Sequence, residues 1–268
     1  MGSKVTILGA RGSVPVSGSF FSKYGCATSC VLLETESEVL LFDAGTGILN
    51  LPARVWKNHR RVHIFLSHSH LDHLMGIPMC PLMFDPKMEV FFYSPDIEKV
   101  LAALNQLMQP PLWPVGTEAF KAKIRYKQLE ENGHLIGDGT AVVRYLSVNH
   151  PGECYAYRVE WEDCSVVYAT DCELYAKSCK KMTDFAENAG LLILDAQYTA
   201  EECHKYEGYG HSDIDTAVSV ILGSGALRGL LFHHAPTRTD EQLDGIETYV
   251  KQKGTQIGVA KEGDQINL

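Results

Sequence analysis

The run Ser67-His68-Ser69-His70-Leu71-Asp72-His73 follows directly on the apolar stretch Val62–Leu66. An apolar run of this length predicts a buried β-strand, so the polar residues after it should lie at one edge of a sheet. Imidazole nitrogens and carboxylate oxygens are ligands for first-row transition metals, and Zn²⁺ is their usual occupant. The alternative is a polar loop that happens to be rich in histidine. The stretch predicts a metal site if partner ligands occur elsewhere in the chain.

Further candidate ligands stand at the ends of other apolar runs. They are His150 after Val142–Val148, Asp171 after Ser165–Ala169, and His233 and His234 after Leu230–Phe232. His211 occupies the Gly-rich turn Gly208–Ser212, ahead of an expected helix. One histidine at a strand end is more often structural than a ligand. The repetition of such endings beside the His-rich run favours a shared centre for two metals.

The hydrophobic pattern predicts secondary structure along the whole chain. Strands are expected at Lys4–Leu8, Cys30–Glu34, Val39–Phe42, Val62–Leu66, Val90–Tyr93, Val142–Val148, Tyr155–Trp161, Ser165–Ala169, Leu191–Leu194 and Leu230–Phe232. Helices are expected at about Pro95–Met108, at Ser212–Leu222 with Ser212 as the N-cap, and at Asp240–Gln252. Strands come first in clusters and then alternate with helices. This order predicts an α/β fold of two sheets covered by helices on their outer faces.

Length and charge narrow the class of protein. The chain has 268 residues with 45% hydrophobic content, which suffices for one large domain spanning residues 1–268. Its formal net charge is -9, from 24 Lys+Arg against 33 Asp+Glu. A protein that grips a long nucleic acid usually shows a basic surface, so this balance argues against such a partner. The densest basic segment, Lys121–Lys127, is expected to alternate along the solvent face of a strand.

The cysteines indicate a reducing compartment. Eight are present, and none forms a Cys-x-x-Cys pair. A chain of this length needs no disulfide staples. With no signal-peptide pattern, we expect free thiols and a cytoplasmic location. No apolar run approaches the roughly 18–20 residues needed to span a bilayer, so no membrane partner is expected.

Several motifs make the chain resemble the metallo-β-lactamase superfamily over nearly its full length. The strongest is the His-x-His-x-Asp-His signature at His68–His73. Local patterns resemble the branch that contains ribonuclease Z and related phosphodiesterases, and they are Gly9–Pro15, Asp43–Gly47, Gly210–Ser212 and His233–Pro236. Within that branch the chain is similar to cyclic-nucleotide phosphodiesterases, including the phage anti-Pycsar enzymes. The resemblance implies an αββα sandwich of two mixed β-sheets with helices on the outer faces.

The resemblance also implies which residues hold two divalent cations, with Zn²⁺ expected and Mn²⁺ or Fe as alternatives. One cation would be held by His68, His70 and His150, and the other by Asp72, His73 and a histidine of the 233–234 doublet. Asp171 would bridge the two. His233 is preferred because the family ligand stands three residues before a proline, here Pro236. His234 remains the alternative ligand.

The implied catalytic residues are Asp72, His211 and Asp195. In the family, a water activated by the metal pair attacks phosphorus while a histidine, here His211, protonates the leaving oxygen. Asp195 matches the acidic partner that orients this histidine, although an aspartate there could instead cap a turn. Asp43 is expected to brace the metal loops by hydrogen bonds rather than to bind metal.

Four functions agree with these features to different degrees. The first is hydrolysis of a small phosphodiester such as a cyclic nucleotide. The second is tRNA 3′-end cleavage, but that family has a long Gly-rich basic arm where this chain has a Pro-rich bend at Pro110, Pro111 and Pro114. A metal-dependent hydrolase of a non-nucleotide substrate and a metal-binding scaffold without turnover are the others. The resemblance further implies a homodimer.

Overall fold

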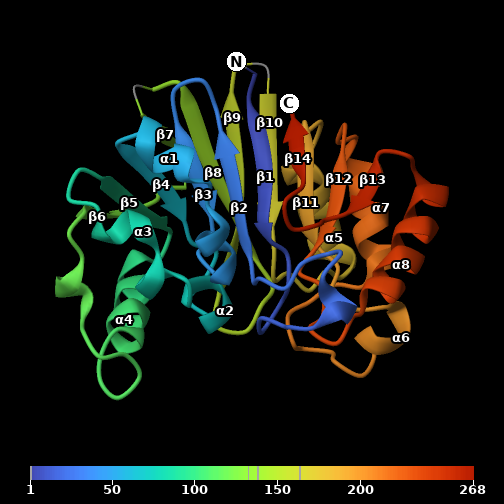
Figure 1. Ribbon diagram of the computed structural model, residues 1–268. Helices are drawn as coiled ribbons and strands as arrows, with labels where there is room; N and C mark the ends of the chain where they lie inside the picture. Colours follow the sequence, from blue (N-terminus) through green and yellow to red (C-terminus); the bar gives the residue numbers. More distant parts are fainter. Residues whose placement is uncertain (1, 132, 138, 163) are drawn as a thin grey trace.

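The strands form two sheets of seven in the computed structural model, which describes residues 2–131, 133–137, 139–162 and 164–268 (Figure 1). The first sheet has the order β14-β1-β2-β3-β4-β5-β6. Its members are β1 (Lys4–Gly9), β2 (Cys30–Glu34), β3 (Val39–Phe42), β4 (Arg61–Phe65), β5 (Glu89–Ser94), β6 (Lys123–Gln128) and β14 (Gln265–Asn267). The second sheet has the order β13-β12-β11-β10-β9-β8-β7. Its members are β7 (His134–Ile136), β8 (Ala141–Val148), β9 (Cys154–Trp161), β10 (Cys164–Ala169), β11 (Leu191–Asp195), β12 (Gly229–Phe232) and β13 (Ile257–Val259).

Helices cover the outer face of each sheet, which gives four layers. On the first sheet lie α1 (Ala53–Asn58), α3 (Pro81–Phe84) and α4 (Ile97–Leu107), and on the second α5 (Ala176–Phe185), α7 (Ile214–Ser224) and α8 (Asp240–Lys253). Two short helices, α2 (Leu71–Leu74) and α6 (Ala200–Cys203), lie toward the lower edge in Figure 1. Single 3₁₀ turns occur at Ser19–Phe21, Thr46–Asn50, Ile77–Met79 and Thr117–Ala119. The predicted αββα sandwich is confirmed.

Strand direction decides where the loops meet. Strands β3 to β6 run parallel to one another, as do β10 to β13. Strand β8 is antiparallel to β9, and β9 is antiparallel to β10, so β8 runs in the direction of β10. The carboxyl ends of β8, β10, β11 and β12 therefore share one edge of the second sheet. In open α/β sheets this edge is where ligands bind.

The two sheets pack through aromatic side chains beneath that edge. Phe42 of β3 stacks on Tyr168 of β10 with ring centroids 5.3 Å apart, and Phe65 lies 5.6 Å from Tyr157. All four rings are fully buried. The hydroxyl of Tyr157 also donates to the carbonyl of Leu66 at 2.6 Å, just ahead of the His-rich run. Aromatic pairs add about 0.5–1.5 kcal/mol each beyond the area they bury. These contacts therefore stabilise the strands from which the His-rich run departs.

Most predicted elements are present, with shifts of one or two residues. The hairpin of Cys30–Glu34 and Val39–Phe42 is confirmed. The expected alternation of basic residues appears in β6, where Lys123, Arg125 and Lys127 are exposed. Helix α5 had no prediction, because its polar sequence has only one fully buried apolar residue.

The predicted N-cap of the helix after His211 is wrong. Asp213 caps α7 instead, with its side chain accepting from the backbone N–H of Thr216. The hydroxyl of Ser212 donates to the carbonyl of Cys172 and accepts from the N–H of Leu174 at 3.2 Å. Ser212 therefore joins two loops at the sheet edge rather than capping the helix.

Among the residues described above, no helix is both long enough and apolar enough to cross a membrane.

Candidate metal centre

Candidate ligands from both sheets meet at one edge of the sandwich. They are His68 and His70 after β4, Asp72 and His73 in α2, His150 after β8, Asp171 after β10 and His233 after β12. These residues come from distant parts of the chain, and strand direction brings them together. They form one group of His68, His70, His150 and Asp171 and a second of Asp72, His73 and His233. Asp171 also lies close to the second group.

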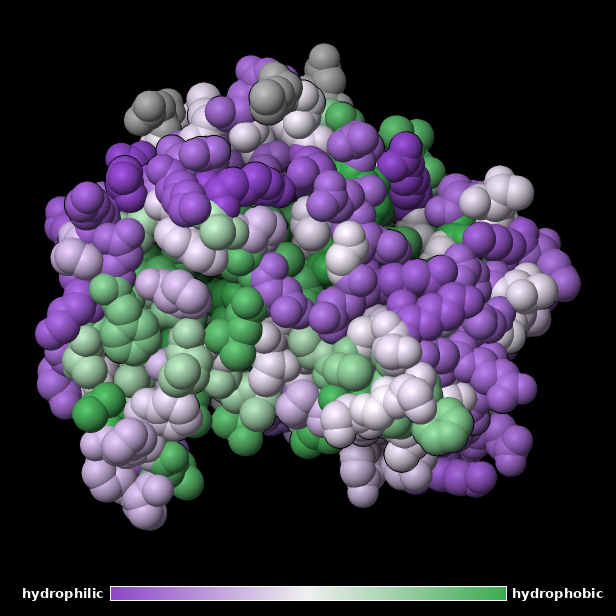
Figure 2. All heavy atoms as spheres, viewed as in Figure 1, coloured by the Kyte–Doolittle hydropathy of each residue, from purple (hydrophilic) through white to green (hydrophobic). Residues whose placement is uncertain are grey.

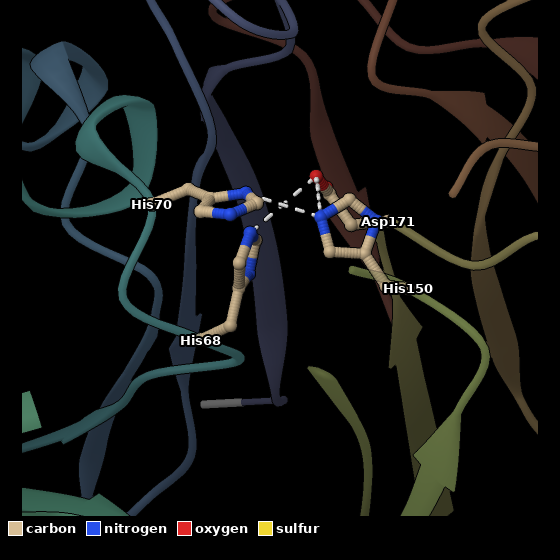
Figure 3. A group of neighbouring side chains, drawn as sticks. All are labelled: His68, His70, His150 and Asp171. Carbon is tan, nitrogen blue, oxygen red and sulfur yellow. Dashed lines mark hydrogen bonds and ion pairs between the residues drawn. The ribbon is translucent and has the colours of Figure 1, made fainter. Parts of the chain in front are cut away.

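The first group consists of His68, His70, His150 and Asp171, whose side chains converge from both sheets (Figure 3). Oδ2 of Asp171 lies 3.6 Å from Nε2 of His68 and 3.7 Å from Nε2 of His150. The same Nε2 of His150 lies 3.1 Å from Nδ1 of His70. One donor atom from each residue lies within 4.8 Å of the others. His70 is the exposed member, so the group opens to solvent beside it.

The second group consists of Asp72, His73 and His233, all of them buried. Oδ2 of Asp72 lies 3.1 Å from Nε2 of His73 and 3.3 Å from Nε2 of His233. Oδ1 of Asp171 lies 3.4 Å from Nε2 of His73 and 3.1 Å from Nε2 of His233. Asp171 therefore faces the first group with Oδ2 and the second with Oδ1.

Buried nitrogen atoms test whether this arrangement fits a metal pair. Nε2 of His68 and Nε2 of His73 are buried and make no hydrogen bond of good geometry to any described residue, although oxygens of Asp171 and Asp72 lie nearby. A buried polar atom without a partner costs about 1–3 kcal/mol. A cation that accepts the nitrogen lone pair removes this cost. The donors, imidazole nitrogen and carboxylate oxygen, fit two divalent cations bridged by Asp171.

Asp43, at the end of β3, supports the His-rich loop from inside. Its Oδ2 accepts from Nδ1 of His73 at 2.8 Å and from the hydroxyl of Tyr168 at 2.7 Å. Its Oδ1 accepts from the backbone N–H of Ser67 at 2.8 Å. A carboxylate on the far nitrogen of a ligating histidine fixes the ring orientation and raises its basicity. These contacts agree with the bracing role predicted for Asp43.

Carbonyl oxygens fix two further rings in the same way. Nδ1 of His150 donates to the backbone carbonyl of Gly210 at 3.0 Å, and Nδ1 of His233 donates to Oε1 of Gln197 at 2.8 Å. Because a carbonyl oxygen only accepts, the ring proton sits on Nδ1 in both histidines. Their Nε2 lone pairs then face Asp171, as metal binding requires.

The electrostatics of the centre favour cation binding at both carboxylates and at His68, whereas at His73 burial is outweighed by the carboxylates of Asp72, Asp171 and Asp43, which raise its pKa well above the ordinary value. Burial alone would raise the pKa of Asp171, but the imidazoles of His233, His73 and His68 hold it well below its usual range. Burial likewise opposes ionisation of Asp72, yet His73 and His233 lower its pKa. Burial, reinforced by neighbouring imidazoles, depresses the pKa of His68 well below its ordinary value. Ionised carboxylates and a neutral imidazole are the forms that coordinate metals.

His211 and Asp195 form a pair beside the second group. The His211 ring stacks on His233 with centroids 4.9 Å apart, and its Nδ1 lies 2.7 Å from Oδ2 of Asp195. Burial would lower the pKa of His211, but the Asp195 carboxylate raises it to about 9. Donor distances would also allow Asp195 and His211 to be grouped with Asp171 and His233 as ligands. The contact with Asp195 uses Nδ1 of His211 and leaves Nε2 open. The catalytic role expected for this pair stays a prediction.

His234 does not belong to either group, so its inclusion among the predicted ligands is corrected. Its Nε2 lies 2.8 Å from the carbonyl oxygen of Ala260, and its ring meets Tyr24 edge-on. Burial lowers its pKa to about 3. His233 takes the position beside Asp171, as the spacing to Pro236 predicted.

Other contacts in the centre were not predicted. The backbone N–H of Ser13 donates to Oδ2 of Asp72 at 2.8 Å, which explains why the Gly9–Pro15 turn lies near the metal loops. Asp43, Asp171 and His233 have φ angles of 58°, 50° and 61°. Such left-handed backbone costs of order 1–3 kcal/mol outside glycine and tends to persist at functional sites. The motif around Ser13 was a usable signal, but the backbone angles left none in the sequence.

The sequence matches one protein family over most of its length. A model of the beta-lactamase superfamily domain matches residues 39–234. A protein named "Probable metallo-hydrolase YhfI" from Bacillus subtilis is 26% identical over 238 residues and 87% of each chain. Ribonuclease Z from Picrophilus torridus is 25% identical over 286 residues, covering 90% of this chain and 88% of that protein.

Solved structures have the same fold. The crystal structure of the metallo-β-lactamase fold protein YhfI from Bacillus subtilis aligns over 100% of both chains with a TM-score of 0.75 and 21% identity. A diphosphatase from the PhnP family aligns over 99% of this chain and 98% of its own, with a TM-score of 0.73 and 18% identity. The matched residues 39–234 include every candidate ligand from His68 to His233. The chain belongs to the beta-lactamase superfamily and is a metal-dependent hydrolase of the metallo-β-lactamase type.

Proposed function

We propose that this hydrolase is a two-metal phosphodiesterase whose substrate is a small phosphodiester, specifically a cyclic nucleotide. The observation that supports it most is the position of Asp171, whose two oxygens face different ligand groups. Two cations held by one carboxylate are spaced to act together on a single phosphoryl group. Residues 1–268 act as one catalytic domain in this proposal.

Each cation has its own ligand set. One would be held by His68, His70 and His150, the other by Asp72, His73 and His233, with Asp171 shared. Zn²⁺ is the expected ion because histidine and carboxylate sets suit it, and Mn²⁺ and Fe are the alternatives. When bound, two such cations polarise a phosphodiester oxygen and lower the pKa of a water molecule that acts as nucleophile.

The protein itself supplies the proton for the leaving oxygen. An alkoxide is a poor leaving group, and a histidine held near its site of departure can protonate it. His211 stacks on His233 and is therefore adjacent to the second ligand set. Asp195 accepts a hydrogen bond from Nδ1 of His211, so the proton that can be transferred is the one on Nε2. Asp72 is held in place by the backbone N–H of Ser13.

Charge favours a small substrate over a long RNA. The formal net charge is -9, and the segment from residue 108 to residue 122, between α4 and β6, has a single basic residue, Lys121. A protein that neutralises many phosphates needs several Lys or Arg side chains along its path. A cyclic nucleotide presents one or two phosphates, which the metal centre alone can engage.

A ribonuclease is the second candidate, because the relative from Picrophilus torridus is named ribonuclease Z. Ionic strength separates the two. A nuclease making 6–10 phosphate contacts loses about 10³–10⁵ in affinity between 50 and 200 mM salt, whereas a cyclic nucleotide should lose only a few-fold.

A substrate panel tests the proposal directly. Zinc- and manganese-loaded protein is assayed side by side with cyclic mononucleotides, cyclic dinucleotides, a pre-tRNA, a lactam and a thioester. Turnover of a cyclic nucleotide with weak salt dependence supports the proposal. Turnover of pre-tRNA alone, of a non-phosphodiester alone or of nothing would refute it. The homodimer and the cytoplasmic location stay predictions, and light scattering on the purified protein tests the first.

A further inference from the structure

A row of aromatic rings leads from His211 to the surface. The His211 ring meets Tyr198 edge-on with centroids 5.8 Å apart. Tyr198 stacks on Tyr206 at 4.9 Å and 19°, and Tyr206 meets Tyr209 edge-on at 5.5 Å. Exposure rises along the row, from 8% at Tyr198 to 41% at Tyr206 and 62% at Tyr209. The inner ring is part of the core, while the outer two present surface to solvent.

The backbone on both sides of Tyr209 is anchored. The N–H of Gly208 donates to Oε1 of Glu173 at 2.8 Å, and that carboxylate belongs to a residue only 3% exposed. The carbonyl of Gly210 accepts from Nδ1 of His150 at 3.0 Å. A Cβ at Gly210 would lie 2.0 Å from that same nitrogen, so the close approach requires glycine. Tyr209 is thus an exposed ring on a backbone that is held at both neighbours.

This anchoring matters for binding. An exposed aromatic side chain on a mobile loop must be ordered when a ligand binds, and ordering lowers affinity. A ring whose flanking residues are already fixed avoids most of that cost. Tyr206 and Tyr209 are well exposed and bury little of their surface. Packing of the core therefore does not explain why these two rings lie here.

The row lies on the same side of the molecule as the metal centre. Figure 1 shows the chain between α6 and α7 along the lower edge, the edge where α2 also lies. Figure 2 shows hydrophobic and weakly polar residues on both sides of a hollow in the lower edge, and strongly hydrophilic residues at the right-hand end of that edge and along the upper rim. Gly210 contacts the ligand candidate His150 directly. Tyr209 directly precedes Gly210 in the chain, so its backbone is one residue away from a contact of the metal centre.

We propose that Tyr209, supported by Tyr206, is the surface on which the substrate's nucleobase stacks. The inference rests on the proposed function and adds a specificity-determining residue to it. Every base has a flat π-face, so stacking selects nucleotides over alkyl phosphodiesters without selecting one base strongly. Loss of one base–aromatic stack lowers affinity by about 5- to 100-fold.

Two chromogenic substrates with the same leaving group test this role. One is the p-nitrophenyl ester of thymidine 5′-monophosphate, and the other is ethyl p-nitrophenyl phosphate, which lacks a base. Tyr209→Ala should lower the ratio of kcat/KM for the thymidine ester to that for the ethyl ester by about 5- to 100-fold, mainly through KM. Tyr209→Phe should keep the ratio, since the ring remains. Tyr249→Ala, at a tyrosine of α8 that is 37% exposed, is the matched control and should keep it too.

Calorimetry gives a readout that does not depend on turnover. Thymidine 5′-monophosphate should bind the zinc-loaded wild-type protein about 5- to 100-fold more tightly than the Tyr209→Ala variant, whereas ethyl phosphate should bind both alike. If no phosphodiester is hydrolysed by the wild type, the proposed function fails, and the calorimetric comparison still decides the role of Tyr209. Equal losses for both esters, or equal nucleotide affinity of wild type and Tyr209→Ala, would overturn the inference.

Discussion

Nδ1 of His211 lies 2.7 Å from Oδ2 of Asp195, and both side chains are buried. Asp195 ends β11, and His211 precedes α7, so the contact joins the sheet edge to the loop that approaches the metal centre. Oδ1 of Asp195 also accepts from the backbone N–H of Ser212 at 3.2 Å. The carboxylate therefore fixes both the His211 ring and the backbone beside it. In the proposed function this pair has the role of proton transfer.

Removing the imidazole of His211 should abolish most turnover while the metals stay bound. His211→Ala should lower kcat by about 10²–10⁴-fold, the usual contribution of a general acid. Steady-state kinetics on the preferred phosphodiester measure the loss, and elemental analysis of the same preparation measures the metal content. His204→Ala is the control, because His204 is exposed at the end of α6.

The pair should also behave as one unit. Asp195→Asn alone should reduce kcat, and the double variant should be little worse than His211→Ala, because residues that act together give non-additive losses. Losses that multiply in the double variant would contradict a shared role. Loss of metal from His211→Ala would instead make His211 a ligand.

Asp43 should increase the affinity for metal without being a ligand itself. Asp43→Asn replaces an acceptor of Nδ1 of His73 and of two hydroxyls with a group that can also donate. Mutation of such a supporting partner typically weakens metal binding by about 10- to 100-fold. Competition with a chromogenic chelator measures the affinity, and Asp184→Asn, on the exposed surface of α5, is the control. Unchanged affinity in Asp43→Asn would show that the loop is held by other contacts.

Acid should remove a stabilising contribution from Glu247 in α8. Partial burial would raise the pKa of Glu247, but hydrogen bonds from Lys251, Lys261 and Tyr24 lower it to about 2, from an ordinary value of 4.5. A carboxyl with a depressed pKa in the folded state stabilises the protein above its unfolded pKa, and this contribution is lost as pH falls through the folded value. Wild type should therefore exceed Glu247→Gln in free energy of unfolding above pH 4.5, and the difference should shrink toward pH 2.

Urea denaturation of metal-free protein at a series of pH values measures that difference. Glu241→Gln, in the first turn of the same helix, controls for the removal of one carboxylate charge. A difference between wild type and Glu247→Gln that stays constant from pH 6 down to the acid limit would contradict the depressed pKa.

The ligand positions were predictable because each one follows an apolar strand. Such ends carry His68, His150, Asp171 and His233. Strands β8, β10 and β12 run in the same direction, so the residues after them lie at one edge of the sheet. The sequence indicated less clearly which histidine of the His233-His234 doublet is the ligand, because both follow the same strand and their side chains point in different directions. The spacing to Pro236 favoured His233, but the left-handed φ of 61° with which His233 lies beside Asp171 has no signal in the sequence.

Contacts between distant loops were beyond prediction for a similar reason. The sequence predicted Ser212 as a helix N-cap. Its hydroxyl instead forms hydrogen bonds with the backbone of Cys172 and Leu174 at the sheet edge. The aromatic row from Tyr198 to Tyr209 depends on how the chain folds back after α6. A residue's type indicates what it can bond, and only the assembled edge determines which partner it meets.

Counting metal ions in Asp171 variants tests the central arrangement most directly. Elemental analysis after saturation with Zn²⁺ and removal of free ion should give two ions per wild-type chain. Asp171→Ala should hold one or fewer, because its carboxylate faces both ligand groups. Asp195→Asn should keep two, because its partner is His211. Two tightly held ions per chain in Asp171→Ala would contradict the shared carboxylate and the metal pair built around it.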